Sequence, residues 1–263
     1  MQVTPDTPRP APAITLRNLT LGYERHPAVH HLSISMAAGS LVAVVGPNGA
    51  GKSTLVRALA GRLRPIEGSI EGLQHQRVAW LAQHSGIDRS FPISVQDMVM
   101  LGLWHEVGAL GRFTAAHRRA GRDALATVGL LGFEKRGIDT LSGGQMQRAL
   151  FARLILQDAP VVLLDEPFAA VDQRTTDDLL ALLHRWHAQG KTVVAVLHDL
   201  GQVRAHFPLT LLLAREPVAW GATAEVLTES HWQRALHMQE PFDDEAPLCA
   251  APSAHRHTGG VSA

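Results

Sequence analysis

The sequence has very little cysteine, few aromatic residues and no excess charge of either sign. Its single cysteine, Cys249, cannot form a disulfide within the chain, which agrees with a reducing compartment. The formal net charge at pH 7 is zero, so no overall basic field attracts nucleic acid or anionic lipid. These features argue against a disulfide-stabilised secreted protein, and we expect no nucleic-acid partner.

Long apolar segments are also missing. Runs such as LVAVV (41–45) and LTLLLA (209–214) are far shorter than the roughly 18 residues that a membrane-spanning helix needs. The first residues, MQVTPDTPRPAPA, lack the charged start and apolar stretch of a secretory signal. We therefore expect a cytoplasmic protein of 263 residues that buries one core, or one core with a smaller lobe.

Strand-like and helix-like segments alternate over most of the chain. Alternating or buried apolar runs predict strands, and they occur at 13–23, 32–36, 40–46, 77–83, 160–165, 192–197 and 209–214. Helices are expected over 52–63 and about 175–189. Such alternation predicts an α/β fold with a largely parallel sheet, covered by helices on both faces and preceded by an antiparallel β subdomain.

Two parts of the chain depart from this alternation. Residues about 91–157 have helical character, and Ser94 with Asp97 forms a capping box at the start of that segment. We expect this segment to form a helical subdomain within one domain spanning 13–240. The proline-rich stretch 1–12 and the tail 241–263 are expected to be disordered.

A complete phosphate-binding motif follows the strand at 40–46. GPNGAGKST (46–54) fits G-x-x-x-x-G-K-[ST] between a strand and a helix, the context that a P-loop requires. Its glycines let backbone N–H groups wrap phosphates, while Lys52 reaches the β- and γ-phosphates and Ser53 offers its hydroxyl to Mg²⁺. The ATP-binding residues expected here are Gly46, Pro47, Asn48, Gly49, Ala50, Gly51, Lys52, Ser53 and Thr54.

Polar residues stand at the ends of other predicted strands. Asp165 and Glu166 follow VVLL, where Asp165 suits Mg²⁺ and Glu166 suits a base for the attacking water. Gln83 and His198 also follow strands, and Asp172 comes six residues after Glu166. Each of these last three, taken alone, is more often a surface residue than a catalytic one.

A second anion-binding feature begins at Leu141. LSGGQ (141–145) precedes a helix, and free N–H groups at a helix start attract anions. The sequence thus contains two phosphate-binding devices.

Together, these motifs resemble those of the ATP-binding-cassette (ABC) ATPases, over roughly residues 14–238. In that family, the P-loop is followed by the Q-loop glutamine (here Gln83), the LSGGQ signature, VVLLDEP, the D-loop aspartate (Asp172) and the switch histidine (His198). Tyr23 matches the position where an aromatic ring stacks on adenine.

The resemblance implies an explanation for the two phosphate devices. Two copies of such a cassette face each other, and each ATP contacts the P-loop of one copy and the signature of the other. Residues expected to act across this homodimer are Ser142, Gly143, Gly144, Gln145 and Asp172. The resemblance also places His198 at the γ-phosphate and Gln83 at Mg²⁺, so Ser53, Gln83 and Asp165 are the expected Mg²⁺ ligands.

Several classes of protein contain this type of ATP-hydrolysing cassette. Only 57 residues separate Gln83 from Leu141, which leaves no room for the long coiled coil of a chromosome-type member. A single P-loop argues against the translation type, which has two cassettes. A transporter subunit and a soluble ATPase that assembles or remodels a protein complex both remain open.

The run from Met98 to Trp104 bears on this choice because all seven residues are non-polar. One interpretation is a helix buried within its own lobe. The other is a hydrophobic surface that receives a membrane permease, and we expect that docking region near Phe91–Trp104.

Longer stretches resemble a narrower group. GIDRSFPISVQDMVMLG (86–102), DEPFAAVD (165–172) and LHDLGQVRAHFP (197–208) are similar to ATPases of zinc- and manganese-type importers. The resemblance implies a peripheral subunit at the cytoplasmic face of the membrane, working with a permease and a metal-binding solute-binding protein. The match after His198 favours zinc, with manganese or iron as the alternative. Fifteen scattered histidines show no ligand spacing that predicts a metal site in this chain.

Overall fold

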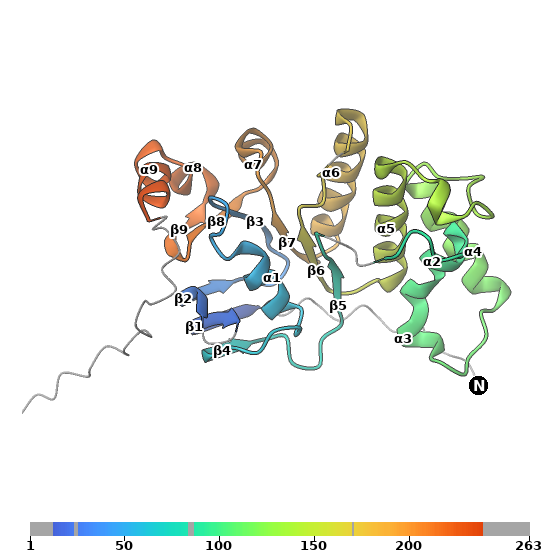
Figure 1. Cartoon of the computed structure of the whole chain (residues 1–263), viewed down its shortest axis with the longest axis horizontal. Coiled ribbons are helices and arrows are strands. Elements are labelled where there is room, and N and C mark those ends of the chain that lie inside the picture. Colours follow the sequence, from blue (N-terminus) through green and yellow to red (C-terminus); the bar gives the residue numbers. More distant parts are fainter. Residues whose placement is uncertain (1–12, 24–25, 84–86, 170, 239–263) are drawn as a thin grey trace, which may run out of the picture.

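The computed structural model describes residues 13–23, 26–83, 87–169 and 171–238. The disorder expected for 1–12 and 241–263 concerns residues outside these ranges. Residues 239 and 240 of the expected 13–240 domain, and Cys249, also lie outside them. Two sheets and a group of helices make up the described part of the chain (Figure 1).

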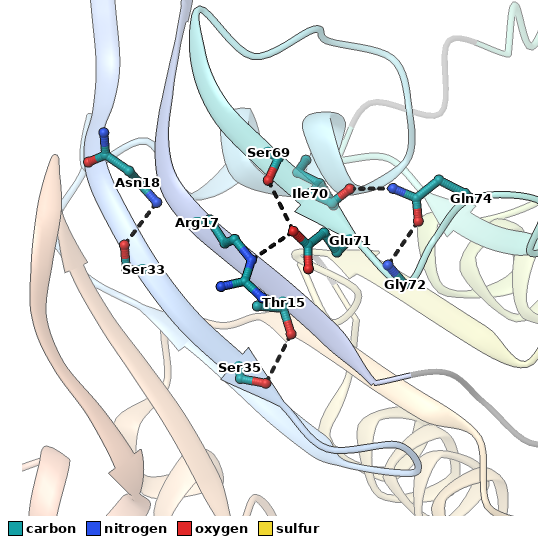
Figure 2. A network of polar contacts seen from close by, with 10 residues as sticks. All are labelled: Thr15, Arg17, Asn18, Ser33, Ser35, Ser69, Ile70, Glu71, Gly72 and Gln74. Carbon is teal, nitrogen blue, oxygen red and sulfur yellow. Dashed lines mark hydrogen bonds and ion pairs between the residues drawn. The ribbon is translucent and has the colours of Figure 1, made fainter.

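The first sheet is antiparallel, as expected, with the order β2-β1-β4. Its strands are β1 (Ile14–Tyr23), β2 (His26–Met36) and β4 (Glu67–Glu71). The sequence analysis missed β4, which is short and follows Gly and Pro residues. Polar contacts join β1 to both of its neighbours (Figure 2). The Arg17 guanidinium of β1 donates to Glu71 of β4 at 2.7 Å, and Thr15 of β1 contacts Ser35 of β2 at 3.2 Å.

The second sheet contains six strands in the order β5-β6-β7-β3-β8-β9. The strands are β3 (Leu41–Val45), β5 (Val78–Leu81), β6 (Val161–Asp165), β7 (Thr192–Val196), β8 (Leu209–Ala214) and β9 (Glu216–Ala222). All pairs are parallel except β8 with β9, which the sequence analysis did not predict. The expected largely parallel sheet is confirmed.

Successive residues of the central strands face two different cores. Ala43 and Val45 pack in the larger core with the helices after residue 94, whereas Val42 and Val44 pack in the smaller core. Helix α1 (Lys52–Leu59) and strands β1 and β2 cover that smaller core. Both sheet faces are therefore buried, which explains why β3, β6 and β7 are apolar throughout.

A group of helices, called the helical subdomain below, is inserted between β5 and β6. It contains α2 (Val95–Met100), η1 (Leu101–Leu103), α3 (Trp104–Val107), α4 (Ala115–Thr127), η2 (Ile138–Thr140) and α5 (Gly143–Gln157). Ser94 caps α2 by accepting from the Asp97 N–H, which confirms the predicted N-cap; the Asp97 carboxylate accepts from the Ser94 hydroxyl, so the reciprocal bond of the predicted capping box is not formed. Helix α5 shares the larger core with α2, α4 and the sheet, so it joins the subdomain to the main body.

The apolar run Met98–Trp104 is mostly internal to this subdomain. Met98, Val99 and Met100 are buried in the larger core. Trp104, by contrast, is 54% exposed, and the earlier Phe91 is 61% exposed. The run therefore packs its own lobe, and the exposed apolar surface is limited to its two flanks.

The remaining helices are α6 (Gln173–Ala188), α7 (Leu200–His206), α8 (Thr223–Val226) and α9 (Glu229–His237). Helix α1 ends at Leu59 rather than near residue 63, since a turn with Gly61 at φ 69° follows it. Within the residues that the structure describes, no helix has the length and apolar character needed to cross a bilayer.

Candidate nucleotide-binding site

The P-loop connects β3 to α1, and its backbone geometry requires glycine. Gly46 has φ 150°, and a Cβ there would lie 1.9 Å from the Leu213 carbonyl oxygen. Gly51 has φ 88° and caps α1, where a Cβ would lie 2.5 Å from the Ala28 carbonyl oxygen. The neighbouring strands thus leave space for backbone only, which lets N–H groups line the loop.

Lys52 is held inside this loop. Its ammonium donates to the carbonyl oxygens of Gly46 at 2.8 Å and Pro47 at 2.7 Å, and the residue is 6% exposed. Burial lowers the pKa of Lys52, while the charges of Glu166 and Asp165 oppose that effect. A phosphate in the loop would place a negative charge directly beside this buried cation, whose present hydrogen-bond partners are neutral carbonyl oxygens.

Ser53 and Asp165 meet beside the loop. The Ser53 hydroxyl donates to Oδ1 of Asp165 at 3.0 Å, and Asp165 is 2% exposed at the end of β6. Burial raises the pKa of this carboxyl, and the hydrogen bond from Ser53 works in the opposite direction. A hydroxyl and a buried carboxylate side by side are the oxygen donors that Mg²⁺ prefers, so these residues fit the expected ion.

Glu166 and His198 follow the adjacent strands β6 and β7. Nε2 of His198 lies 2.7 Å from Oε1 of Glu166. Glu166 has φ 52°, a left-handed conformation that costs a non-glycine residue about 1 kcal/mol. Its N–H bonds the Val196 carbonyl of β7 at 3.2 Å, so the strained turn is tied to the neighbouring strand.

These groups surround one cleft of about 290 Å³. Its lining consists of Ala28, Asn48, Gly49, Ala50, Gly51, Lys52, Ser53, Thr54, Gln83, Glu166 and His198. The fold thus gathers most of the predicted P-loop, the glutamine, the carboxylate and the histidine around one space. Tyr23 does not line the cleft; it is 45% exposed, and its hydroxyl accepts a hydrogen bond from Arg57 of α1 at 2.8 Å.

The signature residues lie apart from this cleft. Ser142 caps α5 by accepting from the Gln145 N–H, and the Gln145 side chain accepts from the Ser142 N–H. Ser142 and Gly143 are exposed. A Cβ on Gly144 would lie 3.7 Å from Oδ2 of Asp172, so these two predicted trans residues are neighbours in the same chain.

Two side chains connect the signature to the rest of the site. The Arg89 guanidinium donates to the Leu141 carbonyl oxygen, and Gln147 of α5 donates to the Pro167 carbonyl at 2.6 Å. Pro167 directly follows Glu166, whereas Arg89 lies in the segment after Gln83. The start of α5 is therefore bonded to the segment after Gln83 and to the segment after Glu166.

The sequence analysis did not single out Ala28, Arg57, Arg89 or Gln147. Arg89 follows the Q-loop glutamine in the sequence, and Gln147 lies one turn into α5. No local sequence pattern indicated which groups these two side chains would contact. Their roles depend on contacts between distant segments, which periodicity does not report.

A second, larger hollow lies on the helical subdomain. Its volume is about 790 Å³, and α2, α4 and the loop after α4 contribute its lining: Gln96, Arg118, Arg119, Arg122, Leu131, Gly132, Glu134 and Lys135. Four of these residues are basic, and Arg122 is 3.7 Å from the carboxylate of Glu134. The hollow therefore presents mainly positive charge.

Known proteins are similar to this chain in sequence and in fold. The sequence model of the family described as "ABC transporter" matches residues 29–169. A manganese transport system ATP-binding protein of Listeria monocytogenes is 37% identical over 226 residues, covering 84% of this chain and 94% of the relative. A zinc transport system ATP-binding protein of Treponema pallidum is 37% identical over 229 residues, covering 85% and 86%.

A solved structure gives the same result at the level of the fold. It is an inward-facing conformation of a protein provisionally described as a metal-chelate type ABC transporter. The TM-score is 0.77 and the identity 32%, over 86% of this chain and 89% of the solved one.

Proposed function

This chain belongs to the ABC transporter family of ATPases, and on that premise we propose that it energises the import of a divalent transition metal ion. The supporting observation is the cleft in which the P-loop, Glu166 and His198 converge, with Asp165 hydrogen-bonded to the cleft residue Ser53. Two relatives of high coverage are named for manganese and zinc transport.

The cleft residues divide the work of ATP hydrolysis. The 46–54 loop binds the phosphates, Lys52 compensates their charge, and Tyr23 stacks on the adenine. Ser53, Asp165 and Gln83 hold Mg²⁺, which neutralises phosphate charge when bound. Glu166 takes the proton of the attacking water, and His198 orients the Glu166 carboxylate and contacts the γ-phosphate.

The site is completed by a second copy of this chain. Support comes from the exposure of Ser142 and Gly143 and from their place outside the lining of the cleft in the described part of the chain. The dipole at the start of α5 stabilises a partner's γ-phosphate when two copies face each other. Gly144, Gln145 and Asp172 belong to the same trans surface.

A membrane permease docks on the helical subdomain near Phe91–Trp104. The exposed rings of Phe91 and Trp104 supply apolar contact, and Gln96 connects this stretch to the basic hollow on α4. A permease segment with acidic side chains fits that hollow by charge. The chain then works at the cytoplasmic face of the membrane, with a solute-binding protein delivering the metal to the permease.

Zinc is our first candidate for the ion, because the LHDLGQVRAHFP stretch (197–208) resembles the zinc members. The manganese and zinc relatives are both 37% identical, so overall identity supports neither over the other. Manganese or iron import is the alternative within this class. A soluble complex-remodelling ATPase is not favoured, since these relatives are named as transport components.

The test is elemental analysis of cells in which Glu166→Gln replaces the native copy under metal limitation. A selective fall in cellular zinc supports the zinc proposal, and a selective fall in manganese or iron supports the alternative ion. Unchanged levels of all three metals would contradict the importer function.

A further inference from the structure

Two histidines from different helices face each other away from the nucleotide cleft. Nε2 of His184, on α6, lies 3.2 Å from Nδ1 of His206, at the end of α7. Their ring centroids are 5.4 Å apart and the rings are tilted by 48°. Neither residue lines the cleft around the P-loop, so this pair is free of the role proposed for ATP hydrolysis.

The spacing of these two nitrogens matches that of two ligands on one metal ion. With Zn–N bonds of about 2.0–2.1 Å and tetrahedral angles, two coordinating nitrogens are about 3.3 Å apart. The observed 3.2 Å is close to this separation, so an ion needs the two rings to turn their facing nitrogens toward a common point without a change in the distance between those nitrogens. An ion can therefore replace the hydrogen bond within the existing arrangement of α6 and α7.

The protonation state also suits metal binding. Partial burial of the His184 ring lowers its pKa, and the nearby charges of His206 and His187 act in the same direction. A neutral imidazole is the form that binds metal. His187 is committed elsewhere, since its Nδ1 donates to the Gly39 carbonyl at 2.7 Å.

The site offers two protein ligands and access to water. His184 is exposed and His206 is half-buried. In the described residues, no group of three or more His, Cys, Asp or Glu side chains is arranged to hold a metal. Water must therefore fill the other coordination positions, and affinity will be lower than at a closed structural site.

We propose that His184 and His206 together bind one divalent transition metal ion of the imidazole-preferring class, such as Zn²⁺. The ion is coordinated by Nε2 of His184 and Nδ1 of His206. The ring that donates in the present hydrogen bond moves its proton to its other nitrogen, so binding releases no proton from the pair. Mg²⁺, which prefers oxygen ligands, does not compete.

The position of the site gives the ion a structural consequence. Helix α6 begins directly after Asp172, and α7 follows His198 by one residue, Asp199, which caps it. A bound ion joins the two helices and stabilises the folded state in proportion to its occupancy.

The test uses full-length protein in which His255 and His257 of the tail are replaced by alanine, to remove their background binding. Zn²⁺ alone is titrated in competition with a chromophoric chelator in the parent protein and in His184→Ala, His206→Ala and His206→Gln. His75→Ala, at an exposed histidine in a turn, is the matched control. Glutamine keeps much of the bulk and hydrogen bonding of histidine but binds zinc poorly, so it separates ligation from packing.

We expect the parent and His75→Ala to bind one more equivalent of Zn²⁺ than the other three variants. Zn²⁺ should raise the Tm of the parent, and this rise should be lost in His206→Gln while the Tm without metal is unchanged. Equal zinc stoichiometry in all proteins, or the same loss in His75→Ala, would overturn the proposal. ATP hydrolysis and transport do not enter these measurements.

Discussion

Nε2 of His198 lies 2.7 Å from Oε1 of Glu166, so the ends of strands β6 and β7 bring the proposed base and its proposed orienting partner into contact. The left-handed backbone of Glu166, bonded to Val196 of β7, aims the carboxylate at this histidine. The strain at Glu166 is therefore located where the reaction needs a fixed carboxylate.

Glu166→Gln should retain ATP and lose hydrolysis. Glutamine keeps the shape and can accept from His198, but it cannot take a proton from water, which removes a contribution of about 100-fold or more to the rate. Trapped ATP should hold two copies together, visible by size-exclusion chromatography with ATP and Mg²⁺. Glu225→Gln, an exposed carboxylate on α8, is the control. Hydrolysis at the wild-type rate in Glu166→Gln would show that Glu166 is not the base.

Asp165→Asn should stabilise the protein in the absence of nucleotide and Mg²⁺. Burial raises the pKa of Asp165 above its ordinary value of 3.8. The folded state therefore favours the protonated carboxyl, and this stabilisation is present below the ordinary pKa and lost as pH rises through the raised one. Asparagine carries no charge at any of these pH values.

The measurement is Tm across a pH series from acid to neutral. Wild type should lose stability relative to Asp165→Asn as pH rises, whereas Asp123→Asn, at an exposed site on α4, should follow wild type. The same Asp165→Asn protein should lose the extra Tm increase that Mg²⁺ gives in the presence of ATP. A difference in Tm that does not change with pH would refute the electrostatic explanation.

Arg89→Ala should slow hydrolysis with little change in the KM for ATP. The Arg89 guanidinium fixes the Leu141 carbonyl at the start of the signature, and Arg89 does not line the cleft around the P-loop. Hydrogen bonds from charged groups contribute about 1.5–3 kcal/mol, which corresponds to a kcat loss of about tenfold or more. Arg89→Lys should recover part of the rate.

Steady-state kinetics at varied ATP concentration separates the two parameters. Arg112→Ala, an exposed arginine in the same subdomain, serves as the control. If Arg89→Ala raised only KM, the role of Arg89 in positioning the signature would be wrong.

Gly144→Ala should fold normally and still lose activity. In one chain the added Cβ meets only Oδ2 of Asp172 at 3.7 Å, an ordinary contact, and alanine favours a helix by about 0.5–1 kcal/mol over glycine. In the proposed dimer the same methyl group would occupy the space of the phosphate bound by the partner copy.

Thermal melting and ATPase assays on the same preparation check this prediction. Gly46→Ala gives the contrasting case, since its Cβ would lie 1.9 Å from the Leu213 carbonyl and must disturb the fold itself. A fully active Gly144→Ala protein would argue against phosphate binding at this glycine.

The sequence by itself determined most of the strands and helices and the motif residues that we expect to carry the chemistry. Glycine spacing at 46–54, the apolar strands at 41–45, 161–165 and 192–196, and the Ser94 cap were all readable, because they depend on local backbone preferences and burial. Strands β4 and β9 were not predicted: β4 forms by pairing with the distant strand β1, and β9, which pairs with the preceding strand β8, is interrupted by Pro217 and Gly221.

Only the tertiary structure decided which of those residues meet. The strand order places β6 beside β7, which brings Glu166 to His198. The packing of segments that are distant in sequence brings Arg89 to Leu141 and His184 to His206. It also decided that Met98 packs inward while Trp104 stays exposed. Contacts between segments far apart in the chain depend on how the layers pack, and the periodicity of a single segment contains no information about its neighbours in space.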